Sequence, residues 1–414
     1  MFDINRFTLD NGLRIVHHHD ASTAMVALNL LYDTGARDES PSLTGIAHLF
    51  EHLMFGGSLN VPDFDGELTA AGGVNNAWTS ADFTNFYEVA PAHNAETLFF
   101  IESDRMLHPT LTGRVLDVQR SVVVEEFKQQ CLNRPYGDAM HHLRPMLYGD
   151  SHPYSWPVIG KVPDHISSVT AEQVNDWWTK RYSPDNAVLA ISGNITLDEA
   201  RRLCDKWFAE IPSRPTPPRN LPPVADITAD ATKTVSGPVP STNIYIAWLM
   251  DPYGTIGYTA ADAISDLLSA GPASRFYRRF IIDGDGTFTD VDASISGSEH
   301  RGMFIVRATL ASPVDDPEQL ARARRTLIDA TRSVITEGVS QRELQRLKNR
   351  QHSLFVMSNL DYLSKALTIA TAELHHEDAD AQINRYLSLT TGDITDSARQ
   401  IFDKPAATLF YVPK

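Results

Sequence analysis

The chain has 414 residues, of which 42% are hydrophobic and 21% charged, values typical of a globular protein with two or three domains. The net charge of -16 argues against non-specific nucleic-acid binding, which needs a basic surface. Two cysteines, Cys131 and Cys204, exclude a disulfide framework. No apolar stretch is long enough to span a bilayer and no signal-peptide pattern is present. We therefore expect no membrane association and a cytoplasmic location, unless a leader to the periplasm has been trimmed.

The first half of the chain alternates between patterns typical of strands and of helices. It opens with a predicted hairpin, in which two strand-like runs flank "DNG", a sequence that favours a tight turn. Apolar periodicity or strand-forming residues then predict the following elements. Strands are expected at residues 23–36, 72–90 and 186–195, and helices at residues 42–56, 62–73, 93–109, 112–133, 170–182 and 196–211.

A proline-rich segment, "PSRPTPPRNLPP" at residues 212–223, divides the sequence. Prolines at this density cannot form a helix or a central strand, so we expect a stiff, extended linker. After it, strand patterns at residues 243–250, 288–297, 302–310 and 406–413 alternate with helical patterns at residues 258–271, 315–338 and 340–359. The repeated order predicts a duplicated α+β unit. The predicted domains are residues 1–211 and 224–414, each a mostly antiparallel sheet with helices packed on one face.

The stretch "GIAHLFEHLMFGG" at residues 45–57 carries the chemistry. On a helix, His48 and His52 lie one turn apart on the same face, a spacing that lets two imidazoles bind one zinc ion. Glu51 can then reach a water at the metal and act as a general base. The order His-x-x-Glu-His is the inverzincin signature. The alternative is a core helix with a polar stripe, which would need partners for all three side chains.

A third protein ligand is expected on the helix "DVQRSVVVEEFKQQ", which contains the adjacent Glu125 and Glu126. Glu126 follows Val122 and Val123 by four and three residues, so we place it on the inward stripe of the helix. Glu125 lies on a more polar face. We predict Glu126 as the ligand, since an inward carboxylate needs a compensating charge; an ion-paired core carboxylate is the alternative.

With these motifs the sequence resembles the pitrilysin-type (M16) zinc metallopeptidases, in particular bacterial members of about this length that are similar to processing peptidases. In that family, His-x-x-Glu-His is followed some seventy residues later by a ligand glutamate; here 73 residues separate His52 from Glu126. Segments such as "NNAWTS" and "HPYSWPVIG" also match. The resemblance implies a Zn2+ site made by His48, His52 and Glu126, with Glu51 as the base. It also implies that Asn76 and Ala77 hold the substrate main chain as an added strand.

Two positions depart from the family pattern. Gln119 stands where the family commonly has a second glutamate, seven residues before the ligand. In the second half, Ile281 and Phe288 stand where the substrate-binding half of the family has an arginine and a tyrosine. Neither side chain can stabilise an oxyanion. We therefore expect a related partner subunit that supplies an Arg/Tyr pair; a homodimer with reduced or altered activity is the competing expectation.

The sequence thus predicts a zinc-dependent endopeptidase, or the zinc-bearing subunit of a heterodimeric one, that cleaves unfolded peptides in a clam-like chamber. A non-catalytic structural subunit and a peptide-binding subunit are the alternatives. The peptide substrate, the cleavage preference and the identity of the partner are not encoded in these motifs.

Overall fold

The computed structural model describes residues 2–297 and 299–414, which form two compact units. The first unit contains the chain up to Phe127 and the segments Pro157–Leu221 and Phe355–Ala381. The second contains Lys128–Trp156, Pro222–Leu354 and Gln382–Lys414. One passage between units, after Leu221, falls inside the proline-rich segment, which contains no helix or strand. Each unit contains segments from both halves of the chain, so the two compact units differ from the two predicted halves. The domain boundary at residues 212–223 stays a prediction.

The first unit is built on a six-stranded sheet with the order β1-β2-β6-β3-β5-β4. β2 and β6 run parallel, and the other neighbouring strands run antiparallel. The predicted hairpin is confirmed, with Asn5 opposite His17. The strands are β1 (Asn5–Thr8), β2 (Arg14–His19), β3 (Met25–Tyr32), β4 (Val74–Thr79), β5 (Thr84–Pro91) and β6 (Ala187–Gly193).

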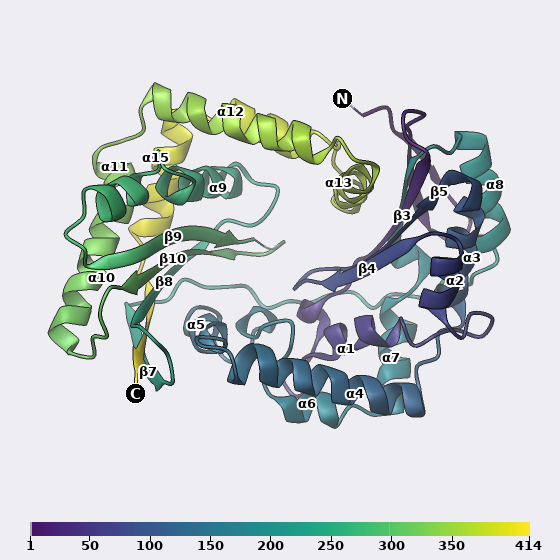
Figure 1. Ribbon diagram of the computed structural model, residues 1–414, viewed down its shortest axis with the longest axis horizontal. Helices are drawn as coiled ribbons and strands as arrows, with labels where there is room; N and C mark the ends of the chain where they lie inside the picture. Colours follow the sequence, from purple (N-terminus) through teal and green to yellow (C-terminus); the bar gives the residue numbers. More distant parts are fainter. Residues whose placement is uncertain (1, 298) are drawn as a thin grey trace. The chain divides into compact units, whose positions relative to one another are not determined.

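Helices cover both faces of this first sheet (Figure 1). α3 and α8 pack on one face, and α13, which comes from much later in the chain, packs on the other. Ala366, Ile369 and Ala370 of α13 share an apolar core with Ala27 and Leu31 of β3, and the small alanines allow close approach. The helices of this unit are α1 (Ile46–Leu53), α2 (Phe64–Ala70), α3 (Ala95–Leu107), α4 (Arg114–Phe127), α6 (Pro163–Ser167), α7 (Ala171–Arg181), α8 (Leu197–Phe208) and α13 (Tyr362–Leu374).

The second unit is built on a five-stranded sheet with the order β7-β11-β8-β10-β9, in which only the β7–β11 neighbours run parallel. α9 packs on one face of this sheet, and α5, from the first half of the chain, packs on the other (Figure 1). The strands are β7 (Ala231–Gly237), β8 (Asn243–Met250), β9 (Phe288–Ser296), β10 (Gly302–Leu310) and β11 (Ala407–Pro413). The helices are α5 (Ala139–Tyr148), α9 (Ile256–Ser269), α10 (Pro317–Thr331), α11 (Ser333–Thr336), α12 (Gln341–Ser358, which ends in the first unit), α14 (Ala381–Ser388) and α15 (Thr391–Phe402).

The two sheets repeat one topology. The order β2-β6-β3-β5-β4 in the first unit matches β7-β11-β8-β10-β9 in the second, strand for strand along the chain. The predicted fold class, two related α+β domains with mostly antiparallel sheets, is confirmed. The prediction that helices pack on only one face of each sheet is wrong, since helices cover both faces. The sequence did not predict that each sheet takes its second covering helix from the other half of the chain, because α5 and α13 carry no local signal of their distant partner strands.

Among the residues that the structure describes, no helix combines the length and the apolar character needed to cross a membrane. The cytoplasmic location stays a prediction of the sequence.

Candidate metal centre

The helix α1 holds the two histidines in place through its apolar side. Leu49, Phe50 and Leu53 are fully buried, which leaves the face with His48 and His52 turned toward α4. Gly45 precedes the helix with φ +87°, and a Cβ there would lie 2.9 Å from the Ile159 carbonyl oxygen. Glycine is therefore the residue that permits the tight entry into α1. The two imidazole rings lie edge to face, with centroids 4.8 Å apart.

The helix α4 packs across α1 (Figure 1). It carries Glu126, which approaches the histidine pair. Glu126 Oε2 lies 3.4 Å from His52 Nε2 and 3.8 Å from His48 Nε2. One ligand atom from each of the three residues lies within 4.8 Å of the others. In a tetrahedral zinc site with bonds of about 2.1 Å, neighbouring ligand atoms are about 3.4 Å apart. The separations from Glu126 are of that size.

Burial and charge put this group in the protonation states that a metal ion requires. Desolvation, reinforced by the neighbouring His52, lowers the pKa of His48 to about 4, although Glu126 opposes the shift. The hydrogen bond with His52 lowers the pKa of Glu126, whose charge is further favoured by both histidines. At neutral pH His48 is therefore an uncharged imidazole and Glu126 a carboxylate, both able to donate an electron pair.

The donor set also fits zinc by its chemistry. Two imidazole nitrogens and one carboxylate oxygen, with room for a fourth ligand, make a combination common in catalytic zinc sites. The Nδ1 atom of His48 is buried and has no hydrogen-bond partner among the described residues. The nitrogens that approach Glu126 are the Nε2 atoms, so this buried Nδ1 would carry the ring proton while Nε2 binds a metal. Within the part of the chain that the structure describes, these three residues are the one group of His, Cys, Asp or Glu side chains found suited to a metal ion.

Glu51 lies on α1 beside this group, and its side chain forms a hydrogen bond with a residue outside the group. Its carboxylate oxygen Oε2 accepts a hydrogen bond of 2.5 Å from Thr79 Oγ1. Burial raises the pKa of Glu51, and the bond from Thr79 partly opposes that rise. A carboxylate with a raised pKa is suited to accept and return a proton. Sequence reasoning missed Thr79, which lies three residues after Asn76 in "NNAWTS".

The structure corrects part of the reasoning that selected Glu126. Val123 is fully buried, as expected, but Val122 is 45% exposed. Glu126 is therefore only half-buried, with 28% of its side chain exposed, at the border between the packed and open sides of α4. Glu125 is exposed, in agreement with its predicted position on the more polar face. The metal-binding role of Glu126 stays a prediction, now supported by its distance from the histidines.

Asn76 and Ala77 lie on β4, the last strand of the first sheet. β4 pairs with β5 on one side, and no further strand of the described chain follows it in the sheet. The Ala77 amide donates to the Asn76 side-chain oxygen at 2.8 Å. A substrate strand added at this edge would have to displace that side chain to reach the amide. The strand also contacts α1, so the open edge lies next to the helix that carries the histidines.

In the second unit, Ile281 is exposed and Phe288 is buried. Ile281 lies in a short π-helix, Tyr277–Ile282, and is 38% exposed. Phe288 begins β9, is 6% exposed, and packs edge to face on Phe280 with ring centroids 5.0 Å apart. Neither residue offers a polar group, as the sequence predicted.

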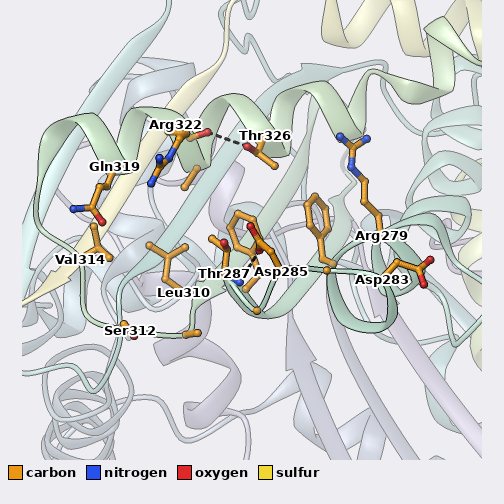
Figure 2. A pocket seen from close by; sticks show the side chains of 16 residues that line it. Arg279, Asp283, Asp285, Thr287, Leu310, Ser312, Val314, Gln319, Arg322 and Thr326 are labelled. Atoms are coloured by element: carbon orange, nitrogen blue, oxygen red, sulfur yellow. Dashed lines mark hydrogen bonds between the residues drawn. The ribbon is translucent and has the colours of Figure 1, made fainter.

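A cavity of about 580 Å³ lies in the second unit over these phenylalanines. Figure 2 shows its rim, where Arg322 and Thr326 of α10 lie across from the loop that carries Asp283 and Asp285. Arg322 is an exposed side chain, and solvation accounts for its charge. The cavity therefore does not replace the missing Arg/Tyr pair.

Comparisons with known proteins identify the class. The family profile described as "Insulinase (Peptidase family M16)" matches residues 14–145, and the profile described as "Peptidase M16 inactive domain" matches residues 168–351. The chain belongs to the M16 peptidase family. The first profile contains His48, Glu51, His52 and Glu126, and the second covers much of the unit with Ile281 and Phe288.

Individual relatives agree with this assignment. The chain is 25% identical to the zinc protease PqqE of Helicobacter pylori, over 98% of this chain and 92% of the relative. It is 22% identical to the uncharacterized zinc protease YmxG of Bacillus subtilis, over 99% of this chain and 98% of the relative. A crystal structure of a protease from Helicobacter pylori matches the fold with a TM-score of 0.89, 23% identity and full coverage of both chains.

Proposed function

We propose that this protein is a zinc-dependent endopeptidase, or the zinc-bearing subunit of a heterodimeric one, that hydrolyses internal bonds of unfolded peptides. The observation that carries the proposal is the group of His48, His52 and Glu126 ligand atoms within 4.8 Å of one another, with Glu51 on the same helix. Its relatives named zinc proteases support the same class of reaction.

Each proposed role follows from a side chain and its surroundings. His48, His52 and Glu126 hold the metal, and a bound zinc ion supplies Lewis acidity toward a water and the scissile carbonyl. Glu51 takes the proton of the attacking water and later returns it to the leaving amine. Asn76 and Ala77 bind the substrate main chain along the open edge of β4. This edge contacts α1, so a peptide docked there extends toward the metal group.

The test uses the purified full chain, its metal content and a library of unstructured peptides. The wild type should contain about one zinc ion per chain and cleave peptides in a chelator-sensitive manner. Glu51→Gln should keep the zinc and lose turnover by roughly 10²–10⁴-fold, the usual size of a general acid–base contribution. Loss of zinc in that variant would contradict the role of Glu51.

The apolar side chains of Ile281 and Phe288, at positions where a polar pair is expected, support a dependence on a partner. We propose that a different, related subunit with an arginine and a tyrosine at these positions supplies the groups that stabilise the oxyanion. The competing version is a homodimer of this chain with reduced or altered activity. Strong cleavage by the chain alone would overturn the requirement for a different partner.

The same observation favours a second candidate, a peptide-binding subunit that does not cleave. This candidate predicts that the protein contains zinc and binds unfolded peptides with the same affinity in the presence and absence of a chelator. It also predicts that no cleavage product forms. Measuring product and binding in parallel separates the two functions.

A further inference from the structure

Thr79 lies where the open strand of the first sheet meets the helix with the histidines. It is the last residue of β4 and pairs with Thr84 of β5. Side chains alternate along β4 between exposed and half-buried, and Thr79 is half-buried. Because β4 contacts α1, the Thr79 side chain reaches Glu51.

The contact is a single, short hydrogen bond. Thr79 Oγ1 donates to Glu51 Oε2 at 2.5 Å. No other hydrogen bond to the Glu51 carboxylate is found within the described chain, so one oxygen is anchored and the second is left open. Glu51 as a whole is 9% exposed, which limits the water available to replace the threonine.

The hydrogen bond from Thr79 limits the orientations that the Glu51 carboxylate can adopt. The terminal torsion of a glutamate side chain is broad, so an unanchored carboxylate samples many orientations. A threonine on a strand is restricted at χ1 by its branched Cβ, which keeps its hydroxyl in one direction. The bond therefore restricts the orientation of the carboxylate and holds one of its two oxygens at Thr79.

We propose that Thr79 is a positioning residue, which orients Glu51 so that its free oxygen receives the proton of the attacking water. The proposal deepens the proposed peptidase function and rests on it. β4 then has two roles: its open edge is proposed to bind the substrate, and its last residue, Thr79, orients Glu51.

The first test needs no activity. A double-mutant cycle compares the melting temperatures of the zinc-loaded wild type, Thr79→Val, Glu51→Ala and the double variant. Thr79→Val should lower the melting temperature by a few degrees in the wild type and by less than about one degree in Glu51→Ala, since the bond is then already lost. Additive shifts would overturn the pairing of the two side chains.

The second test measures turnover. Thr79→Val should lower kcat about 10–100-fold, a range typical of residues that orient a metal-site group, while KM changes less than about threefold and zinc content is unchanged. Thr79→Ser keeps the hydroxyl and should restore kcat to within about fivefold of the wild type. Thr84→Val is the matched control, because it removes the hydroxyl bond to Thr34 O in the same sheet without touching Glu51; it should alter stability more than kcat.

A third measurement separates positioning from substrate docking. In a Glu51→Gln background, Thr79→Val should leave the peptide dissociation constant within about twofold. A parallel loss of peptide affinity, or a kcat of Thr79→Val equal to that of the wild type, would overturn the proposal. If the zinc-loaded wild type cleaves no peptide, the proposed function fails, and the melting cycle still decides whether Thr79 holds Glu51.

Discussion

Each unit has a helix with two ionisable side chains four residues apart, but the two helices use different chemistry. In the first unit, α1 follows β3 and carries His48 and His52. In the second, α9 follows β8, the strand that corresponds to β3, and carries Asp262 and Asp266. The spacing is the same, and Ser265 stands at the place of Glu51.

A side chain from another helix completes each pair. Glu126 of α4 approaches the two imidazoles, which leaves a group with lone pairs for a cation. In the second unit, Arg350 of α12 forms an ion pair with Asp266 at 2.6 Å, and Gln351 of the same helix donates to Asp262 at 3.3 Å. An arginine occupies the space where a metal would compete for the carboxylates. Two ionisable side chains at the same helical spacing therefore belong to a candidate metal centre in one unit and to an ion-paired cluster in the other.

The largest effect is expected from removing the carboxylate that distinguishes the first cluster. Glu126→Ala should lower zinc affinity by more than roughly 100-fold, since even residues that only orient zinc ligands contribute 10–100-fold. Peptide cleavage should disappear with the metal. Zinc titration and elemental analysis measure the effect. Glu125→Ala changes the adjacent, exposed carboxylate and serves as the control; equal zinc loss in both variants would argue against Glu126 as the ligand.

Replacing the side chains of the second cluster by those of the metal group should create a zinc site in the second unit. The triple variant Asp262→His, Asp266→His and Arg350→Glu reproduces the donor types of the metal group on α9 and α12. We expect zinc stoichiometry to rise from about one to about two ions per chain. The added ion should bring no new cleavage, because Ser265 cannot serve as a base. A stoichiometry of one in the folded triple variant would show that equal spacing on the helix is insufficient.

Asp262 should make the stability of the second cluster depend on pH. Burial, with the nearby Asp266, raises its pKa from 3.8 to about 6, although Arg350 opposes the rise. A carboxyl group whose folded-state pKa is raised destabilises the fold when it ionises, so its stability contribution is full below about pH 4 and declines up to about pH 6.

Asp262→Asn removes this ionisation and tests the expected pH dependence. The stability difference from the wild type should be small at pH 4 and reach up to about 3 kcal/mol in favour of the variant at pH 7.5. Denaturant unfolding at both pH values measures the difference. If the stability gain of the variant is the same at both pH values, the gain comes from packing and not from the charge of Asp262.

The smallest effect is expected from the ion pair with Arg350. Its side chain is 44% exposed, so solvent screens the interaction, and Arg350→Met should lower the unfolding free energy by only about 1 kcal/mol at neutral pH. Arg399→Met breaks the more exposed pair with Asp396 and should change stability by less than about 0.5 kcal/mol. Equal losses in the two variants would show that proximity to Asp262 gives Arg350 no added role.

Local patterns were sufficient for much of this protein. The spacing of His48, Glu51 and His52 required only the geometry of one helix, and the hairpin at Asn5 required only its turn residues. Helix caps are equally local, since the Thr170 and Thr196 side chains accept hydrogen bonds at the starts of α7 and α8. Repeated strand and helix patterns also predicted the duplicated fold.

Contacts between distant segments depended on tertiary packing. Glu126 reaches the histidines because α4 crosses α1, and Val122, predicted to face inward, is exposed because that crossing buries only part of α4. Thr79 reaches Glu51 because β4 ends beside α1, and α13 covers a sheet whose strands lie more than 150 residues earlier. A sequence pattern reports which side of an element is apolar; which other element covers that side is decided by packing of the whole unit, where shape and burial act together.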